Sequence, residues 1–236
     1  MKKNNPSFPM SPREEVLGWI LVLLHGFILA DALGLLYALV HPATGLTLTA
    51  GTFNLVYYAV SFVLVLLCLF SFMRENFGLL LKNILQTLTF IAVCYFIDMF
   101  LTVIISWLEE LASTGANPNQ QAVEAVTKLN PGAMMAVAVC LAPFVEEALF
   151  RGVVFGTLKK HSRILAYAVS IALFALYHLW GSLINDFSWT TVLQLADYVP
   201  GGLALAICYD KSENIYGPIF LHMLLNFVAV TVTIGL

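Results

Sequence analysis

Two adjacent glutamates, Glu146 and Glu147, lie in the middle of an apolar stretch of the chain and are followed shortly by Arg151. A carboxylate in the hydrocarbon of a membrane costs at least ~2.5 kcal/mol by insertion scales. Two neighbouring carboxylates cost more, because their like charges repel each other. Ionisable groups that a membrane segment retains at such a cost commonly mark functional sites, so we expect this pair to take part in chemistry.

Helical spacing gives the two glutamates different surroundings. Glu147 and Arg151 are four residues apart, which places them on one helix face where they can pair. Glu146 points about 100° away from Glu147, as successive residues of a helix do. We expect Glu147 and Arg151 to neutralise each other and Glu146 to face a cavity. The competing interpretation is a buried ion-pair network that only fixes helix packing.

Three more polar side chains fall on two later apolar segments. His178 shares a helix face with Phe174, and His222 shares one with Asn226, since the members of each pair are four residues apart. At ~1.5 Å per residue, all the polar groups lie ~10–21 Å from the expected cytoplasmic ends of their helices. We therefore predict that they converge on one site. Taken singly, the histidines and the amide are also typical of hydrogen-bonded packing residues.

Such a set of groups supports hydrolysis in two ways. A glutamate can act as the general base on a water, while histidine and asparagine donate hydrogen bonds to a developing oxyanion. Alternatively, Glu146, His178 and His222 match the ligand set of a catalytic zinc, with water at the open position. Spacing alone does not separate the two, and the sequence contains no His-Glu-x-x-His motif.

The composition is that of an integral membrane protein. Of the 236 residues, 60% are apolar and 11% are charged, whereas soluble domains carry about 25% charge. The mean hydropathy is +0.88. We expect a single membrane domain, residues 1–236, in a multi-pass protein of a bacterial plasma membrane. No basic cluster indicates a nucleic-acid partner, and the lipid bilayer is the expected surrounding of the chain.

Seven apolar segments are long enough to cross a membrane, which takes about 20 residues. The predicted fold is an all-α, polytopic transmembrane helix bundle. Its spans are predicted at residues 16–40, 53–73, 80–108, 133–158, 164–184, 190–209 and 215–236. The sixth is the weakest, because Asp197, Pro200 and a glycine pair interrupt it. A short helix is predicted at 120–129, within the longest polar stretch.

The basic residues orient the bundle. If seven spans alternate in direction, one side holds every lysine and arginine of the loops except Lys128, so the N-terminus is predicted to be cytoplasmic. The run from Lys159 to Arg163 is then a cytoplasmic anchor. Residues 30–32, Ala-Asp-Ala, resemble a signal-peptide cleavage site, but the apolar stretch continues past them and two acidic residues precede it. We expect the first span to be retained.

The remaining polar and sulfur-containing residues receive structural interpretations. The four cysteines are expected to be buried and unpaired, and Cys140, two helical turns before Glu147, is at most a minor candidate nucleophile. Four further polar residues in the spans are read as packing or hydration partners: His25, Asp31, Asp98 and Asp197. Asp31 or Asp98 could also line the cavity, and Asp197 could mark a broken helix.

The three polar motifs together resemble a known family. Glu146-Glu147-x-x-x-Arg151, Phe174-x-x-x-His178 and His222-x-x-x-Asn226 are similar to the motifs of the CAAX protease and bacteriocin-processing family, also called CPBP or Abi. All motif residues are present and in order. The resemblance covers residues 133–236 as a family-like catalytic core, with residues 1–132 as variable N-terminal spans.

The resemblance implies an intramembrane glutamic endopeptidase. Glu146 would activate the water, His178 would help to hold it, and His222 with Asn226 would stabilise the oxyanion. Glu147, Arg151 and Phe174 would support the site, and no metal would be required. The substrate would be a peptide or a membrane protein, and the family includes enzymes that act on prenylated, lipidated chains.

Two other function classes compete with a protease. A non-catalytic membrane scaffold or bacteriocin-immunity protein could reuse the fold, but it would not need a base facing an oxyanion hole. A proton-coupled transporter would also retain buried carboxylates and histidines. The polar groups are concentrated in one half of the chain, however, and no inverted repeat is evident.

Overall fold

The computed structural model describes residues 10–45, 47–185 and 187–235, and these residues form helices and loops without a strand. Seven of the helical segments are long and apolar enough to cross a membrane, which confirms the predicted all-α bundle of about seven spans. They lie at Pro12–Thr44, Ala50–Cys68, Ile84–Ala112, Pro131–Lys159, Arg163–Asn185, Trp189–Ser212 and Tyr216–Ile234.

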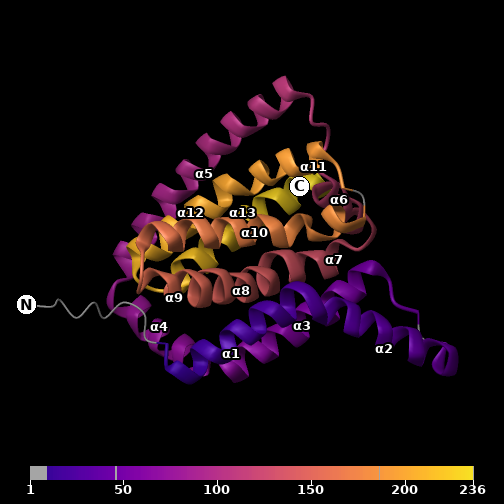
Figure 1. Cartoon of the computed structure of the whole chain (residues 1–236), viewed down its shortest axis with the longest axis horizontal. Helices are drawn as coiled ribbons and strands as arrows, with labels where there is room; N and C mark the ends of the chain where they lie inside the picture. Colours follow the sequence, from indigo (N-terminus) through magenta and orange to yellow (C-terminus); the bar gives the residue numbers. More distant parts are fainter. Residues whose placement is uncertain (1–9, 46, 186, 236) are drawn as a thin grey trace, which may run out of the picture.

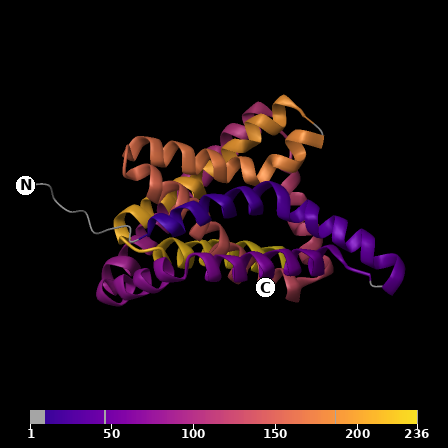
Figure 2. The same cartoon turned by 60° about the horizontal axis from the view of Figure 1, so that its bottom comes forward.

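The first two spans lie along the lower edge of the bundle in Figure 1, and the turned view of Figure 2 brings this edge toward the viewer. The first consists of α1 (Pro12–Leu23), a π-helical turn η1 (Leu24–Ile28) and α2 (Leu29–Thr44). A capping box between Ser11 and Glu14 starts α1. The second span is α3 (Ala50–Cys68).

The fourth span is the centre of the structure and runs as one continuous helix with two π-helical stretches. It comprises α7 (Pro131–Met134), η2 (Met135–Leu141), α8 (Ala142–Glu147), η3 (Ala148–Phe155) and α9 (Gly156–Lys159). Every residue of η3 is buried. A Cβ on Gly152 would lie 2.9 Å from Cε1 of Phe72, and one on Gly18 would lie 2.5 Å from Cγ2 of Val153. Glycine at these two positions therefore permits the close packing around η3.

One helix was not predicted. The segment α4 (Phe70–Lys82) lies between the second span and α5 (Ile84–Ala112), whereas the hydropathy pattern assigned its two ends to neighbouring spans. It buries Phe72, Met73, Asn76 and Leu80 along one face. The Asn76 Oδ1 accepts a hydrogen bond from the backbone N–H of Ile215 at 2.9 Å, so α4 helps to fix the start of the last span. The helix α6 (Pro118–Leu129) confirms the short helix expected in the polar stretch.

The sixth span is interrupted where the sequence predicted a break. After α10 (Arg163–Asn185), the chain forms α11 (Trp189–Leu193), a 3₁₀ turn η4 (Gln194–Asp197) and α12 (Tyr198–Ser212), and then α13 (Tyr216–Ile234). Asp197 at the break accepts a hydrogen bond from Asn117 Nδ2 at 2.6 Å. The break is thereby attached to the loop before α6.

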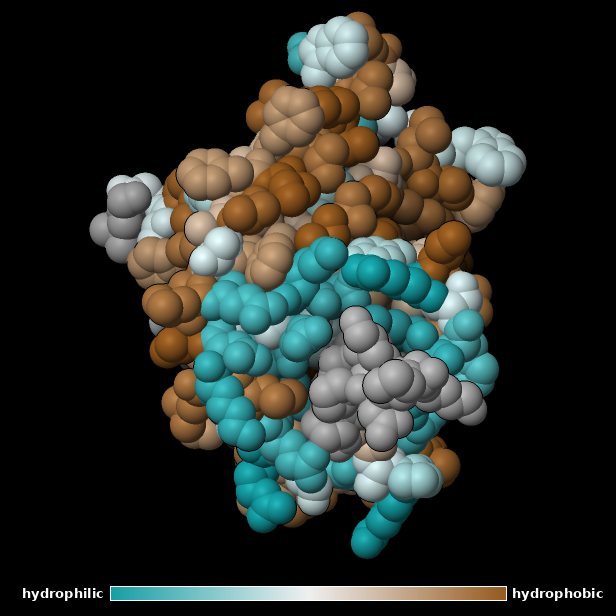
Figure 3. Space-filling view, turned by 90° about the vertical axis from the view of Figure 1, so that its left-hand side faces the viewer, coloured by the Kyte–Doolittle hydropathy of each residue, from teal (hydrophilic) through white to brown (hydrophobic). Residues whose placement is uncertain are grey.

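One end of the bundle is polar. Hydrophilic residues gather on the face shown in Figure 3, which is the end of α4 and α9 in Figure 1, and apolar residues surround them. Asp210 binds there to Lys159 at 2.6 Å, to the hydroxyl of Tyr167 at 2.9 Å and to Arg163. Lys160 and Glu15 form a further ion pair at 2.5 Å. These contacts tie α1, α9, α10 and α12 together; the cytoplasmic orientation of this end stays a prediction.

The prediction for the cysteines was partly wrong. The cysteines are unpaired, and Cys94 and Cys208 are buried, but Cys68 is only partly buried and Cys140 is exposed. Cys140 belongs to η2, whose π-helical turns change the face on which each later residue falls. Its side chain is thus on the outside of the bundle rather than among the buried groups of α8.

Candidate functional site

Glu146 lies at the C-terminal end of α8 and is 2% exposed. Its Oε1 accepts a hydrogen bond from the hydroxyl of Tyr58, on α3, at 2.7 Å. Its Oε2 lies 3.8 Å from Nε2 of His178, on α10. The two oxygens of this carboxylate therefore have different surroundings: one is held by a phenol, and the other faces an imidazole.

His178 is oriented by its own helix. Its Nδ1 lies 2.8 Å from the carbonyl oxygen of Phe174, which can only accept, so Nδ1 carries a proton and donates it. In the neutral ring Nε2 then carries the lone pair. The ring also stacks on Tyr198 with centroids 4.6 Å apart and contacts the ring of Phe174 at 4.5 Å. These contacts hold Nε2 toward Glu146.

Glu146 Oε2 and His178 Nε2 are close enough for one water molecule to bridge them from the side. A distance of 3.8 Å is too long for a direct hydrogen bond, and Glu146 Oε2 and neutral His178 Nε2 are both acceptors. A single water can donate one hydrogen to each of them. The His178 side chain is 18% exposed, whereas the Glu146 side chain is 3% exposed, so the open side of the pair lies at the histidine.

The predicted pairing of Glu147 with Arg151 is confirmed, and it includes a third member. Both side chains are fully buried and their Oε1 and Nη1 atoms are 2.9 Å apart. His222 of α13 donates from Nδ1 to the same Oε1 at 2.9 Å. The other guanidinium nitrogen, Nη2, donates to the carbonyl of Gly202 at 3.0 Å, and the guanidinium lies 4.4 Å above the ring of Phe174. One carboxylate thus orients an arginine of its own span and a histidine of the last span.

Asn226 replaces a backbone hydrogen bond that Pro143 cannot make. In the π-helical pattern of η2, the N–H of Ala142 bonds to the carbonyl of Val137. The next bond would run from residue 143 to Ala138, but proline has no N–H. Asn226 Nδ2 donates to this Ala138 carbonyl at 2.7 Å and so replaces the missing bond. One hydrogen of the amide nitrogen is committed there, and the second remains for another acceptor.

The structure therefore connects the predicted residues in two groups around Phe174. Its carbonyl binds His178, which faces Glu146, and its ring lies under Arg151, which belongs to the group of Glu147 and His222. Asn226 binds the backbone carbonyl of Ala138, which lies in the same span as Glu146 and precedes it by two helical turns. The contacts establish this arrangement, while the chemical roles of the residues stay predictions.

Sequence reasoning missed the tyrosines that contact Glu146. The hydroxyl of Tyr58 binds the carboxylate, and the hydroxyl of Tyr177 lies 3.0 Å from that of Tyr58. Tyr177 directly precedes His178, which is a signal that could have suggested it. Tyr58 lies in a predicted variable span, where only the Tyr57-Tyr58 pair within an apolar run distinguishes it.

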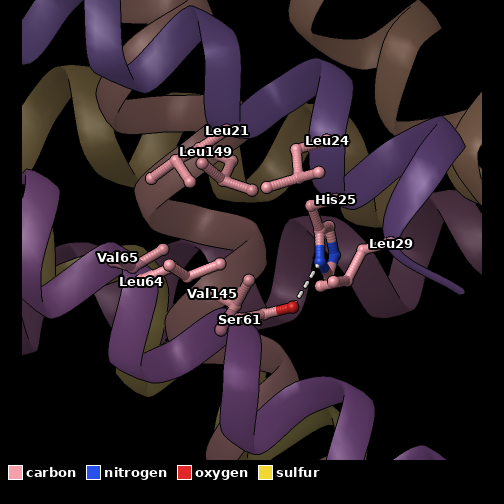
Figure 4. Close-up of a pocket in the computed structure, with 9 residues that line it drawn as sticks. All are labelled: Leu21, Leu24, His25, Leu29, Ser61, Leu64, Val65, Val145 and Leu149. Carbon is pink, nitrogen blue, oxygen red and sulfur yellow. Dashed lines mark hydrogen bonds between the residues drawn. The ribbon is translucent and has the colours of Figure 1, made fainter. Parts of the chain in front are cut away.

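His25 is a hydrogen-bonded core histidine, in agreement with its interpretation as a packing residue. Its Nδ1 lies 2.9 Å from Ser61 Oγ, which donates its own proton to the carbonyl of Tyr57 at 2.9 Å. Figure 4 shows this bond beside a cavity of about 10 Å³ that leucine and valine side chains otherwise line. Among the acidic residues considered for the site, Asp31 is exposed and Asp98 is buried beside Gly201.

The zinc alternative requires Glu146, His178 and His222 to lie about 2 Å from one ion. Within the described parts of the chain, no three His, Cys, Asp or Glu side chains form such a group. His222 binds Glu147 through Nδ1 and keeps Nε2 free, an arrangement that metal-binding histidines also adopt. The expectation that no metal is required stays a prediction.

An open, uncharged cavity of about 500 Å³ lies along α10, on the C-terminal side of His178. Gly181 and Ser182 line it, and they follow His178 by three and four residues, or about one helical turn. The rest of its lining is uncharged and rich in hydroxyl and amide groups: Thr114, Gly115, Ala116, Pro118, Asn185, Ser188, Thr190, Thr191 and Gln194. Such a lining can hydrogen-bond a peptide backbone without selecting for charge.

Comparison with known proteins finds similarity across much of the second half of the chain. Residues 128–228 match the family described as Type II CAAX prenyl endopeptidase Rce1-like. A Bacillus subtilis (strain 168) protein named "Putative membrane peptidase YdiL" is 28% identical over 113 residues, which are 48% of this chain and 41% of that protein. No solved structure is similar enough to count as a match.

Two Lactococcus lactis subsp. lactis (strain IL1403) proteins are also similar. UPF0177 protein YaiF is 26% identical over 175 residues, covering 71% of this chain and 74% of that protein. UPF0177 protein YvdC is 27% identical over 118 residues, covering 50% of this chain and 42% of that protein. The chain thus spans less than half the length of YdiL and of YvdC. The predicted resemblance to CAAX proteases is confirmed, and the bacterial relatives indicate a multi-pass protein of the plasma membrane.

Proposed function

We propose that this Rce1-like, CAAX-type membrane protein is an endopeptidase that hydrolyses a peptide bond inside the membrane with a water activated by Glu146. The observation that carries the proposal is the pair of acceptors, Glu146 Oε2 and His178 Nε2, which face each other across 3.8 Å. A buried carboxylate that can share a bridging water with a second acceptor is suited to general-base catalysis.

The mechanism follows from the acceptor positions. A water between Glu146 and His178 gives one proton to Glu146 as its oxygen attacks the scissile carbonyl carbon. The carbonyl π electrons move to the oxygen, and a tetrahedral oxyanion results. When this intermediate collapses, the C–N bond breaks and Glu146 returns the proton to the leaving amine. The carboxylate is thus regenerated, and the products are an acid and an amine.

Donors for the oxyanion are assigned to His222 and Asn226. Glu147 accepts a hydrogen bond from Nδ1 of His222, so Nε2 can donate to the oxyanion only when the ring carries a proton on both nitrogens, and the proposal assigns this doubly protonated form to His222. Asn226 has one amide hydrogen beyond the one that binds Ala138. The Glu147–Arg151 pair is assigned a supporting role, because both of its members are engaged with each other and fully buried.

The substrate is assigned as a peptide or membrane-protein segment that reaches His178 through the open cavity. That cavity is uncharged and starts one turn beyond His178, so it can hold an extended backbone next to the reacting groups. A lipid anchor on the substrate is compatible with an enzyme in the bilayer. The substrate can be identified by comparing the peptide termini in the membrane proteomes of cells that carry the wild type or an inactive variant. A terminus that is present only with the wild type marks the cleavage site.

Filling the cavity is expected to block the reaction. A Cβ at Gly181 meets no atom within 4 Å, so this position has space for a side chain. We expect Gly181→Trp to lower kcat/KM by about tenfold or more, equivalent to ~1.4 kcal/mol of lost binding. Gly181→Ala is the matched control and should retain wild-type activity. Equal activities of the two variants in steady-state assays would show that substrate does not pass through this cavity.

Chelators are expected to leave the activity unchanged. The proposed mechanism uses only side chains, and the described residues hold no zinc-like ligand group. Peptide hydrolysis should therefore survive 1,10-phenanthroline and EDTA, and purified protein should contain less than stoichiometric metal by plasma mass spectrometry. Chelator inactivation that added Zn²⁺ reverses would contradict the proposal and support coordination by Glu146, His178 and His222.

A further inference from the structure

We propose that Tyr58, supported by Tyr177, is a positioning residue that selects Oε2 of Glu146 as the catalytic base. This inference rests on the proposed function and adds to it a residue from the first half of the chain. Tyr58 is on α3, outside the residues 128–228 that match the family.

The directions of the hydrogen bonds in this cluster follow from the number of protons. The Tyr57 hydroxyl donates its proton to the carbonyl of His25 at 2.6 Å. The Tyr58 hydroxyl donates to Oε1 of Glu146 at 2.7 Å, since a carboxylate can only accept. Tyr58 can therefore only accept from Tyr177 at 3.0 Å. The Tyr57 hydroxyl, whose own proton goes to the His25 carbonyl, also lies 3.4 Å from that of Tyr177, and we assign the single Tyr177 proton to the nearer acceptor, Tyr58. The result is a chain of two donors, Tyr177 to Tyr58 to Glu146, that ends on one carboxylate oxygen.

This chain determines which oxygen acts. A buried carboxylate without a donor on Oε1 could turn and present either oxygen, or accept both hydrogens of the nearby water. With Oε1 occupied by Tyr58, the available oxygen is Oε2, which faces His178 at 3.8 Å. Consecutive hydrogen bonds polarise each other, so Tyr177 strengthens the bond that Tyr58 makes.

Neighbouring residues hold the tyrosines rigidly. The ring of His25 stacks on Tyr57 at 4.9 Å and on Tyr177 at 5.2 Å, and it meets the edge of Tyr58 at 5.6 Å. Ser61 fixes the His25 ring through Nδ1. A phenol in such a packed cluster has little freedom to leave the carboxylate, which is what a positioning residue requires.

The first two spans therefore contribute to the site. Residues 1–132 were predicted to be variable and to carry no motif, yet α3 supplies the hydrogen bond to Glu146. The cluster around Tyr58 joins η1, α3 and α10, so the first span, the second span and the fifth are all needed to hold one carboxylate.

Neighbouring tyrosines allow a matched test. Tyr58→Phe removes the bond to Glu146, whereas Tyr57→Phe removes an adjacent hydroxyl that donates to the His25 carbonyl instead. We expect Tyr58→Phe to lower kcat by about 10–100-fold, as removal of an orienting hydrogen bond does elsewhere. Its KM should stay within about twofold, because Tyr58 acts on the base rather than on the substrate. Tyr57→Phe should keep wild-type kcat.

The assay uses full-length protein in detergent and a synthetic peptide that spans the wild-type-specific cleavage site. 4-Aminophenylalanine at position 58 retains an N–H donor and should restore most of the lost kcat. Equal unfolding midpoints would show that the variants are folded. Wild-type kcat in Tyr58→Phe, or equal losses in the two phenylalanine variants, would overturn the inference. If Glu146→Gln is inactive while Tyr58→Phe is fully active, only this inference fails; if Glu146→Gln is active, the proposed function fails.

Discussion

Replacing Glu146 by glutamine is expected to abolish peptide hydrolysis and to leave the protein folded and inserted. Glutamine has the same shape, and its Oε1 can still accept the hydrogen bond from Tyr58. It cannot take a proton from water, so the base that the mechanism requires is lost. General acid–base catalysis by one group contributes about 10²–10⁴-fold, and we expect a loss at the upper end of this range or beyond it.

The readout is the set of peptide termini in the membrane proteome of cells that carry either version. A terminus produced with the wild type and absent with Glu146→Gln names the substrate, and a synthetic peptide across that site then gives kcat. Equal expression and equal unfolding midpoints in detergent control for folding. Undiminished cleavage by the variant would falsify the glutamate mechanism. A biological effect that survives the substitution, without any cleavage, would favour the scaffold or immunity alternative.

Much of the fold could be predicted, because membrane spans depend on local composition. Apolar length indicated seven spans, and Asp197 with Pro200 indicated the break that η4 forms. The helix α4 was missed for a local reason as well. It buries Phe72 and Leu80 on one face, and in a hydropathy pattern these residues merge with the ends of the spans on either side.

The site divides into contacts within one helix and contacts between helices. The ion pair between Glu147 and Arg151 could be predicted, since helical geometry alone places residues four apart on one face. The pairing of Glu147 with His222 joins residues 75 positions apart, and that of Glu146 with Tyr58 joins residues 88 positions apart. Helical spacing says nothing about such distances. They depend on how the spans pack, which is a property of the whole bundle.

The π-helical stretches could not be predicted from the sequence either, and they give one motif residue, Asn226, an additional structural contact. Asn226 was expected to act in the oxyanion hole, with a hydrogen bond between helices as the competing interpretation. In the structure it binds the Ala138 carbonyl, which Pro143 leaves without a backbone donor. The helix irregularity before Glu146 and the amide proposed to stabilise the oxyanion are thus joined by a single hydrogen bond.

Replacing Arg151 by methionine is expected to destabilise the protein by about 3–5 kcal/mol, the typical cost of removing one partner from a buried ion pair. The carboxylate of Glu147 would remain fully buried with His222 as its donor, and the Gly202 carbonyl would lose its bond to Nη2. The measurement is equilibrium unfolding in mixed detergent micelles, followed by tryptophan fluorescence.

The double variant Glu147→Gln with Arg151→Met separates an ion pair from a loss of packing. Neither introduced side chain is charged, so no unpaired charge is buried, and the amide oxygen of the glutamine introduced at position 147 can still accept from His222 Nδ1. We therefore expect the double variant to be more stable than Arg151→Met alone, with a coupling energy in the range of about 0.5–3 kcal/mol for contacting residues. Strictly additive losses would contradict this, because they would mean that Glu147 and Arg151 do not act as a unit. Since Glu147 also orients His222, recovery of folding without recovery of full activity would place this pair in support of the oxyanion donor rather than in the chemistry itself.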